Sequence, residues 1–261
     1  MKTNYHTHHY LCNHANGDMT DYIEEAILKQ YSEIGISDHG PLPNEPFPRM
    51  SIEAFKNVYL KEFRECKVKY QNKIKTFIGL EIEYIFGMDD YYHKLREEVD
   101  YLILACHYYS GKPGYEMKSY YDCNTPEKLL EYTELVEKAL DTKLFKILAH
   151  PDIYMLGYPD FDSLNEICVN RILDAAERND VVVQLNANGI RKGKIRNENG
   201  KMVYAYPYRK FWEIVKARKS KVVIGSDCHD PSQLDDMAMA EARKLADELK
   251  LNIIEKLSDE F

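Results

Sequence analysis

The sequence lacks the features of membrane proteins and of serine or nucleotide-binding enzymes. No apolar run approaches the ~18 residues that a membrane-spanning helix needs, and the N-terminal segment is polar, unlike a signal peptide. There is no G-x-S-x-G motif and no glycine-rich phosphate loop. Internal repeats, low-complexity tracts and linkers are missing as well. We therefore expect a single cytoplasmic domain over residues 1–261, with no membrane partner.

A compact cysteine framework and excess basic charge are also lacking. The six cysteines include no C-x-x-C pair, so we expect reduced, mostly buried thiols that bind no metal. The formal net charge is -8, whereas nucleic-acid binding surfaces are usually basic. The composition therefore disfavours nucleic acid as a partner. A small phosphorylated substrate is still compatible with it, because a bound metal ion reverses the local charge.

The chain does contain a regular alternation of short apolar runs and longer helical patterns. We predict strands at residues 2–6, 34–37, 74–83, 101–106, 145–149, 181–186 and 221–226. The middle strands are apolar throughout, which is typical of parallel strands covered by helices. Helices are expected to begin at Thr20, as the N-cap, and at Pro126, behind the cap Thr125. The fold class is thus α/β, a distorted seven-stranded β/α (TIM-like) barrel, with an open doubly wound sheet as the alternative.

Histidines and carboxylates stand where these strands end. His6 and His8 follow the first strand, and in extended backbone residues i and i+2 point to the same side, so the two can bind one ion. The others at strand ends or in the next loop are His14, His39, Glu81, His107, His150, Asp227 and His229. Only His9 and His93 fall outside the pattern. Because the carboxyl ends of barrel strands meet at one face, these nine side chains should converge.

Such a group indicates metal-dependent hydrolysis. A catalytic zinc takes three or four protein ligands, so nine fit two or three divalent ions that share carboxylates. Imidazole and carboxylate without thiolate favour Zn, Mn or Fe. Ions of this kind lower the pKa of a bound water to ~7 and bind phosphoryl oxygens. We expect a phosphoester hydrolase, and a metal-binding or regulatory module without turnover is the alternative.

On these residues the sequence resembles the polymerase-and-histidinol-phosphatase (PHP) superfamily. The motifs concerned are His6-Thr7-His8, Ser37-Asp38-His39, Gly79-Leu80-Glu81, Cys106-His107, His150-Pro151 and Gly225-Ser226-Asp227-Cys228-His229. Further motifs are similar to its histidinol-phosphatase branch: His39-Gly40-Pro41-Leu42-Pro43, Arg49-Met50-Ser51, residues 185–192 and residues 227–231. The resemblance implies the PHP fold and hydrolysis of L-histidinol phosphate to L-histidinol and phosphate in histidine biosynthesis. A PHP phosphoesterase that acts on another phosphomonoester or on a nucleotide is the alternative.

The resemblance also implies a ligand assignment. One ion would be bound by His6, His8, Glu81 and Asp227, a second by Glu81, His107 and His150, and a third by His14, His39 and His229. Glu81, Asp227 and His229 would then be catalytic, together with Arg191. Asp38 and Glu83 adjoin these positions, and we expect them to orient ligand imidazoles.

Basic residues follow the sixth strand, at Arg191, Lys192, Lys194, Arg196 and Lys201. We predict that Arg191 binds the phosphate, because it comes directly after the strand and its guanidinium fork suits a phosphate. A solvated loop is the alternative, and Arg209 is a second candidate for substrate binding. The amine and imidazole of the substrate need acceptors, for which Asp152, Glu116 and Glu83 are candidates. The surface helices would permit a homodimer.

Overall fold

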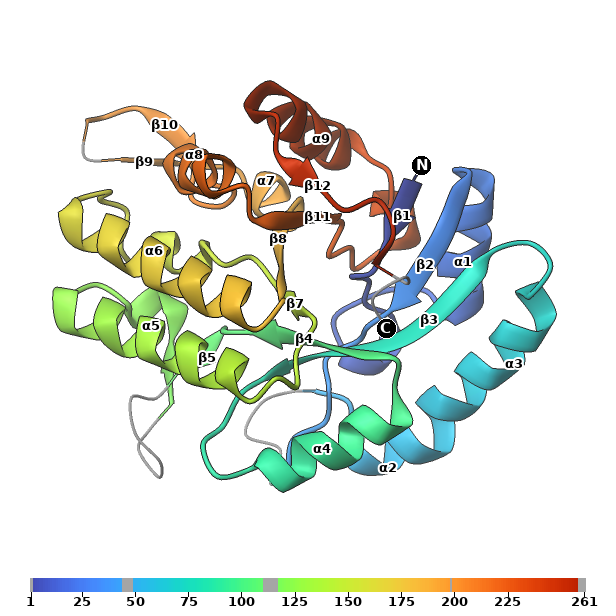
Figure 1. Ribbon diagram of the computed structural model, residues 1–261. Coiled ribbons are helices and arrows are strands. Elements are labelled where there is room, and N and C mark those ends of the chain that lie inside the picture. The colour runs from blue at the N-terminus through green and yellow to red at the C-terminus, as the bar shows by residue number, and fades with distance from the viewer. Residues whose placement is uncertain (1, 44–48, 110–116, 198, 258–261) are drawn as a thin grey trace.

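The centre of the fold is one curled sheet of parallel strands. The computed structural model describes residues 2–43, 49–109, 117–197 and 199–257 (Figure 1). The sheet has eight strands in the order β1-β2-β3-β4-β7-β8-β11-β12. They are β1 (Lys2–Asn4), β2 (Tyr31–Ile36), β3 (Lys75–Glu83), β4 (Tyr101–Ala105), β7 (Ile147–Leu148), β8 (Val182–Asn186), β11 (Lys221–Gly225) and β12 (Asn252–Ile253). The first seven overlap the seven predicted strands, and the α/β class is confirmed.

The curl brings the first and the seventh of these strands together at their carboxyl ends. Thr7, after β1, and Cys228, after β11, form a parallel bridge. The His8 amide donates to the Cys228 carbonyl at 2.9 Å, and the Asp227 amide donates to the His6 carbonyl at 2.9 Å. At the amino ends β12 pairs with β11 instead. The barrel is therefore distorted as expected, with an eighth strand that the sequence pattern did not predict.

Helices cover the outer face of the sheet (Figure 1). They are α1 (Met19–Leu28), α2 (Ile52–Ala54), α3 (Leu60–Tyr70), α4 (Asp89–Glu98), α5 (Pro126–Asp141), α6 (Ser163–Arg178), α7 (Asn188–Arg191), α8 (Arg209–Arg218) and α9 (Met237–Leu249). Helix α5 begins as predicted, with Thr125 as the cap. Helix α1 does not, because Asp18 forms a reciprocal capping box with Asp21 and so takes the place predicted for Thr20.

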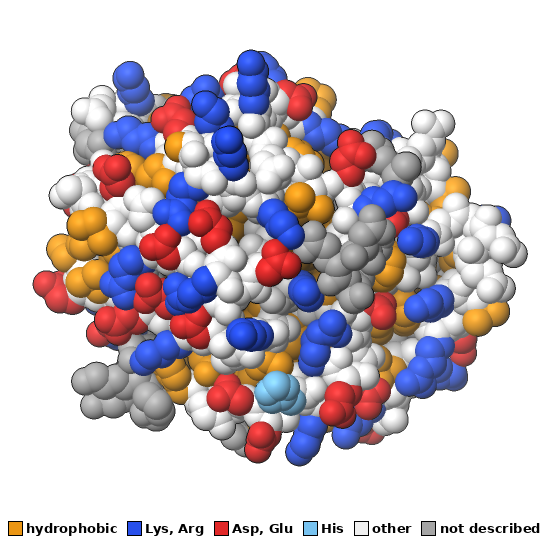
Figure 2. Space-filling model, in the orientation of Figure 1, with side chains coloured by type: hydrophobic (Ala, Val, Ile, Leu, Met, Phe, Trp, Pro, Cys, Tyr) orange, Lys and Arg blue, Asp and Glu red, His pale blue; other side chains and the backbone are white. Residues whose placement is uncertain are grey.

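Two small hairpins lie outside the main sheet. Strand β5 (Tyr108–Tyr109) pairs with β6 (Lys118–Ser119), and β9 (Lys194–Arg196) pairs with β10 (Met202–Tyr204), both antiparallel. The surface drawn in Figure 2 mixes Lys and Arg with Asp and Glu side chains, with hydrophobic ones scattered among them. Within the described part of the chain, no helix has both the length and the apolar character needed to cross a bilayer.

The interior of the curl is filled with apolar side chains towards the amino ends of the strands. Tyr101 is buried there with Tyr5, and its hydroxyl donates to the Tyr5 carbonyl at 2.7 Å. Gly35 and Gly79 make room for this ring, since a Cβ on either would lie within 2.4 Å of a Tyr101 atom. The barrel is therefore packed at its base, which leaves the carboxyl rim for polar groups.

Candidate metal centre and active site

The side chains predicted from the strand ends gather around Glu81 at the rim of β3. Its Oε2 atom lies 3.4 Å from Nε2 of His6 and 3.4 Å from Nε2 of His8. The same oxygen lies 3.0 Å from Nδ1 of His39. All four side chains are buried. Residues from three neighbouring segments of the barrel thus share one carboxylate oxygen.

The second oxygen of Glu81 faces two further imidazoles. Its Oε1 atom lies 3.0 Å from Nε2 of His150 and 3.8 Å from Nε2 of His107. The two histidines follow β7 and β4, which are neighbours in the sheet. With imidazoles on both of its oxygens, Glu81 has the placement that a carboxylate needs to bridge two ions.

Asp227, which follows β11 and lies beside the segment after β1, joins the group formed by Glu81, His6 and His8. Its Oδ1 atom lies 3.0 Å from Nε2 of His8, and its Oδ2 atom accepts hydrogen bonds from the side-chain amides of Asn186 at 3.1 Å and Asn188 at 3.3 Å. Its backbone has φ of 48°, and that of His150 has φ of 29°. Residues other than glycine rarely adopt positive φ, and such strain is concentrated at functional sites.

A third group lies nearer to solvent. The ligand atoms of His14, His39 and His229 all lie within 4.8 Å of one another. Nδ1 of His14 lies 2.8 Å from the carbonyl oxygen of Cys12, which fixes the ring and leaves Nε2 for the group. This set coincides with the third ligand set that the resemblance implies.

Asp38 contacts two histidines of the segment that follows β1. Its buried carboxylate lies 3.4 Å from Nδ1 of His8 and accepts a hydrogen bond from Nδ1 of His9. The contact with His8 suits the orienting role expected of Asp38. His9, which falls outside the strand-end pattern, therefore helps to hold the imidazole of His8 through Asp38.

Burial and charge act against each other in this cluster. Burial alone would raise the pKa of Glu81 and of Asp227, but the surrounding imidazoles hold both well below their ordinary values. Burial lowers the pKa of His39, and it lowers that of His229 to about 3, so these rings are neutral and offer lone pairs. Burial would lower the pKa of His8 too, but Asp227 and other carboxylates raise it to about 10. The raised pKa of His8 reflects carboxylates that favour a positive charge at this position, which a metal ion can supply in place of a proton.

The donor atoms themselves fit metal ions. Nε2 of His6 and Nε2 of His8 face each other at 3.0 Å. Oε2 of Glu81 faces ring nitrogens of His6, His8 and His39, yet it is buried and makes no hydrogen bond within the described residues. Buried polar atoms normally have partners, and nitrogen and carboxylate oxygen are ligands that Zn, Mn and Fe accept. The residues present therefore suit divalent ions of this kind.

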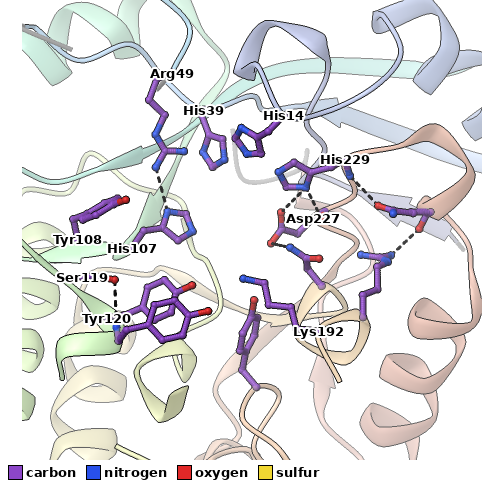
Figure 3. Close-up of a pocket in the computed structure, with 15 residues that line it drawn as sticks. His14, His39, Arg49, His107, Tyr108, Ser119, Tyr120, Lys192, Asp227 and His229 are labelled. Carbon is purple, nitrogen blue, oxygen red and sulfur yellow. Dashed lines mark hydrogen bonds and ion pairs between the residues drawn. The ribbon is translucent and has the colours of Figure 1, made fainter. Parts of the chain in front are cut away.

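A cavity of about 660 Å³ opens above the cluster (Figure 3). It is lined by the cluster residues His14, His39, His107, Asp227 and His229, and by the tyrosines Tyr108, Tyr120, Tyr121 and Tyr206. Figure 3 shows the Arg49 side chain beside His39 and His107, and the Lys192 side chain near Tyr120. Nζ of Lys192 lies 6.0 Å from the ring centroid of Tyr120. The cavity thus brings together candidate metal ligands, four tyrosine side chains and the basic side chains of Arg49 and Lys192.

Arg49 is held in this cavity by Glu83. The guanidinium donates to Oε1 of Glu83, and the same oxygen lies 3.0 Å from Nδ1 of His107. The contact with His107 suits the orienting role expected of Glu83, and it leaves Glu83 poorly placed as an acceptor for a substrate amine. Arg49 was assigned no role from sequence, although Arg49-Met50-Ser51 was among the resembling motifs. Glu116, another acceptor candidate, lies outside the described residues.

Arg191 lines the cavity, but its guanidinium is bound elsewhere. Nε donates to Oδ2 of Asp236 at 2.8 Å, Nη1 to the Ser226 carbonyl at 2.6 Å and Nη2 to the Gln233 carbonyl at 2.8 Å. The geometry therefore does not support the predicted role of Arg191 in binding phosphate. Its neighbour Lys192 and the more distant Arg49 present cations to the cavity instead.

The two remaining substrate candidates lie away from the cavity. Arg209 is exposed on α8 and forms ion pairs with Glu213 and Glu248. Asp152 is buried, and its Oδ2 atom accepts a hydrogen bond from Nε1 of Trp212 at 2.9 Å. Burial raises the pKa of Asp152 to about 7. We therefore correct both predictions: Arg209 is a surface residue, and Asp152 supports the start of α8.

Comparison with known proteins gives consistent matches. The family model described as PHP domain matches residues 4–188. A histidinol-phosphatase of Bacillus subtilis is 24% identical over 262 residues, which cover 88% of this chain and 94% of that protein. A Deinococcus radiodurans protein named "Probable histidinol-phosphatase" is 26% identical over 239 residues, with 88% and 86% covered. The fold is also similar to the crystal structure of a histidinol phosphate phosphatase from Lactococcus lactis, which is complexed with zinc, L-histidinol and phosphate. The TM-score is 0.71 and the sequence identity is 17%, and the match covers 97% of this chain and 95% of that one.

Proposed function

The chain belongs to the PHP domain family, and from this premise we propose that it is a metal-dependent phosphatase that hydrolyses L-histidinol phosphate to L-histidinol and phosphate. The observation that carries the proposal is the convergence of imidazoles on Glu81 and Asp227. This cluster lies beneath a cavity that is also lined by the basic side chains of Arg49 and Lys192. Relatives named histidinol-phosphatase support this choice of substrate. So does the fold likeness to the phosphatase solved with L-histidinol and phosphate.

Two to three divalent ions, Zn, Mn or Fe, belong to this proposal. His6, His8, Glu81 and Asp227 would hold the first, Glu81, His107 and His150 the second, and His14, His39 and His229 the third. Bound ions supply Lewis acidity and lower the pKa of water to ~7. The third set is the most open to solvent, because His14 is exposed and His229 is only partly buried.

Arg49 and Lys192 would bind the phosphate. Glu83 holds the guanidinium of Arg49 at the edge of the cluster, and Arg49 lines the cavity in which the phosphate would bind. Lys192 brings its ammonium to the side lined by Tyr120 and Tyr206. Negative charge develops on the phosphoryl oxygens during transfer, and prearranged cations at these oxygens lower the barrier. The catalytic contribution of the chain, apart from holding ions, is thus electrostatic.

The tyrosine wall would receive the body of the substrate. Tyr108, Tyr120 and Tyr206 line the cavity together with the candidate metal ligands. Aromatic rings favour edge-to-face and offset contacts with one another, which suits an imidazole ring. Among the described lining residues Asp227 is the sole carboxylate. The amine of L-histidinol would therefore rely on neutral acceptors such as Ser119 and Gln233.

The test is phosphate release from L-histidinol phosphate, compared with p-nitrophenyl phosphate and a nucleoside monophosphate, by protein supplied with Zn or Mn. A strong preference for L-histidinol phosphate is expected. Metal-dependent release from the other esters alone would move the protein to a different phosphomonoesterase role. No release from any ester, with metal bound, would leave a metal-binding module without turnover and overturn the proposal.

A further inference from the structure

A second cavity, of about 480 Å³, lies between the β9–β10 hairpin and the helices α8 and α9. Its apolar surface comes from Ile190, Val203, Pro207 and Leu245. None of these residues lines the first cavity, so the two cavities are distinct. The hairpin and the two helices lie in the upper part of the molecule in Figure 1, and Figure 2 shows several Lys and Arg side chains there, with Asp and Glu among them.

The rim of this second cavity is basic although the chain is acidic overall. Three exposed lysines, Lys194, Lys201 and Lys244, line it, and no ion pair to any of them is found within the described residues. The acidic members are Glu241 and Glu248, and Glu248 is already paired with Arg209. A cluster of uncompensated lysines in a chain of net charge -8 marks a local preference for anions.

We propose that the second cavity binds a small organic anion, that is, a carboxylate, sulfonate or phosphate carried on an apolar or aromatic body. The apolar surface would take the body, and the lysines at the rim would neutralise the charged group. The volume lies within the ~300–1,000 Å³ range of small-molecule pockets. An inorganic anion alone would leave the apolar surface uncovered and should bind far more weakly.

Helix α7 forms the wall between the two cavities. Asn188 lines the first cavity, and Ile190 on the same single helical turn lines the second. Gly189 packs directly on the carbonyl of Tyr206, since a Cβ there would lie 1.9 Å from that oxygen. Tyr206 and Lys192 both line the first cavity. A ligand that holds Ile190 in place should therefore also reduce the motion of α7 and of Lys192.

The site can be tested with 8-anilinonaphthalene-1-sulfonate, an aromatic sulfonate whose fluorescence rises in apolar surroundings. Trp212, the sole tryptophan, lies on α8 and can serve as the energy donor. We expect saturable binding of one dye per chain. The triple variant Lys194→Gln, Lys201→Gln, Lys244→Gln should bind at least about tenfold more weakly, since three exposed charge contacts are removed.

A matched control removes the same charge elsewhere. Lys56, Lys61 and Lys67 are exposed on the helical segment 52–70, and their triple change to glutamine should leave dye affinity unchanged. We call the variant with glutamine at Lys194, Lys201 and Lys244 the rim variant. Equal dye affinity of the rim variant and the wild type would overturn the proposed site. So would dye that binds without saturation, or dye that is displaced by inorganic phosphate, which belongs to the first cavity.

The coupling through α7 has its own measurement, which needs no enzymatic activity. The amides of Arg191 and Lys192 donate to the carbonyls of Ala187 and Asn188 at 3.3 and 3.0 Å. Hydrogen exchange in this segment should slow when the dye is bound to the wild type, and should not change in the rim variant. Dye binding that depends on the rim lysines but leaves this exchange unaltered would overturn the coupling.

Discussion

Arg191 and Asp236 form a two-point ion pair, with Nε 2.8 Å from Oδ2 and Nη2 3.1 Å from Oδ1. Arg191 ends α7, and Asp236 caps α9 by accepting the Met239 amide at 3.0 Å. The pair therefore links α7, which borders both cavities, to α9, which follows β11. Both side chains are mostly buried, at 13% and 26% exposure, so the pair is only weakly screened by solvent.

Changing Arg191 to methionine should lower the free energy of unfolding by about 2 to 4 kcal/mol, because the carboxylate and two carbonyls lose their donor in a partly buried place. Urea unfolding measures the difference. Arg209→Met is the matched control, and loss of its exposed pairs should cost less than about 1 kcal/mol. An Arg191 variant of unchanged stability but raised KM for the phosphate ester would instead restore Arg191 as a phosphate ligand.

The same ion pair predicts a dependence on pH. Burial would raise the pKa of Asp236, but the hydrogen bonds from Arg191 and from the Met239 amide lower it below its ordinary value. A carboxyl group with a lowered folded pKa stabilises the fold above its unfolded pKa of ~3.9, and this is lost as the pH falls through the folded pKa. The stability difference between wild type and Asp236→Asn should be constant near neutral pH and shrink below about pH 4. A difference that grows on acidification would contradict this origin.

The strand-end pattern could be recognised in the sequence because a parallel strand carries its last residues to a common rim. His150 and Asp227 lie 77 positions apart, yet each follows an apolar run by one or two residues. The eighth strand could not be found in this way. It has only two residues, Asn252 and Ile253, and pairing with β11 rather than a local pattern makes it a strand.

The direction of a basic side chain could not be predicted in the same way. Arg191, Lys192 and Lys194 are close in sequence, but they point to Asp236, to the first cavity and to the second cavity. Residue type and spacing do not settle which of the three meets a phosphate. The direction of the Arg191 side chain is set by Asp236, 45 residues later in the chain. The Arg49 side chain is likewise positioned by Glu83, 34 residues later.

Arg49→Met should reduce kcat/KM for the phosphate ester by about 10²-fold, because it removes a prearranged donor to the phosphoryl oxygens. Arg49→Lys keeps the charge but not the guanidinium fork, so it should recover only part of the activity. Steady-state kinetics on protein of verified metal content makes the comparison. Activity in Arg49→Met equal to that of the wild type would exclude Arg49 from phosphate binding.

Lys192→Met should raise KM by about 10- to 100-fold, the range expected for a lost hydrogen bond to a charged group. Lys194→Met is the matched control, since it removes the same charge two residues away at the second cavity. Its KM should stay within about twofold of the wild type, because exposed charges outside the site contribute little. Equal effects of the two changes would point to a general charge effect and not to a contact.

Glu81 and Glu83 lie on the same face of β3 but contact different side chains. Changing each one to glutamine therefore distinguishes a proposed metal ligand, Glu81, from a residue that orients a ligand, Glu83. Glu81 contacts the imidazoles of His6 and His8, whereas Glu83 contacts His107 and Arg49.

Glu81→Gln should lose bound metal and turnover together, because it removes the carboxylate charge that we propose bridges two ions. Glu83→Gln should keep most of its metal and lose about 10- to 100-fold in affinity or activity, the usual effect of a residue that orients a ligand. Metal analysis of both purified variants, beside their kinetics, measures the contrast. A full metal complement in Glu81→Gln would overturn its assignment as the bridging ligand, whereas metal loss confined to Glu83→Gln would transfer that role to Glu83.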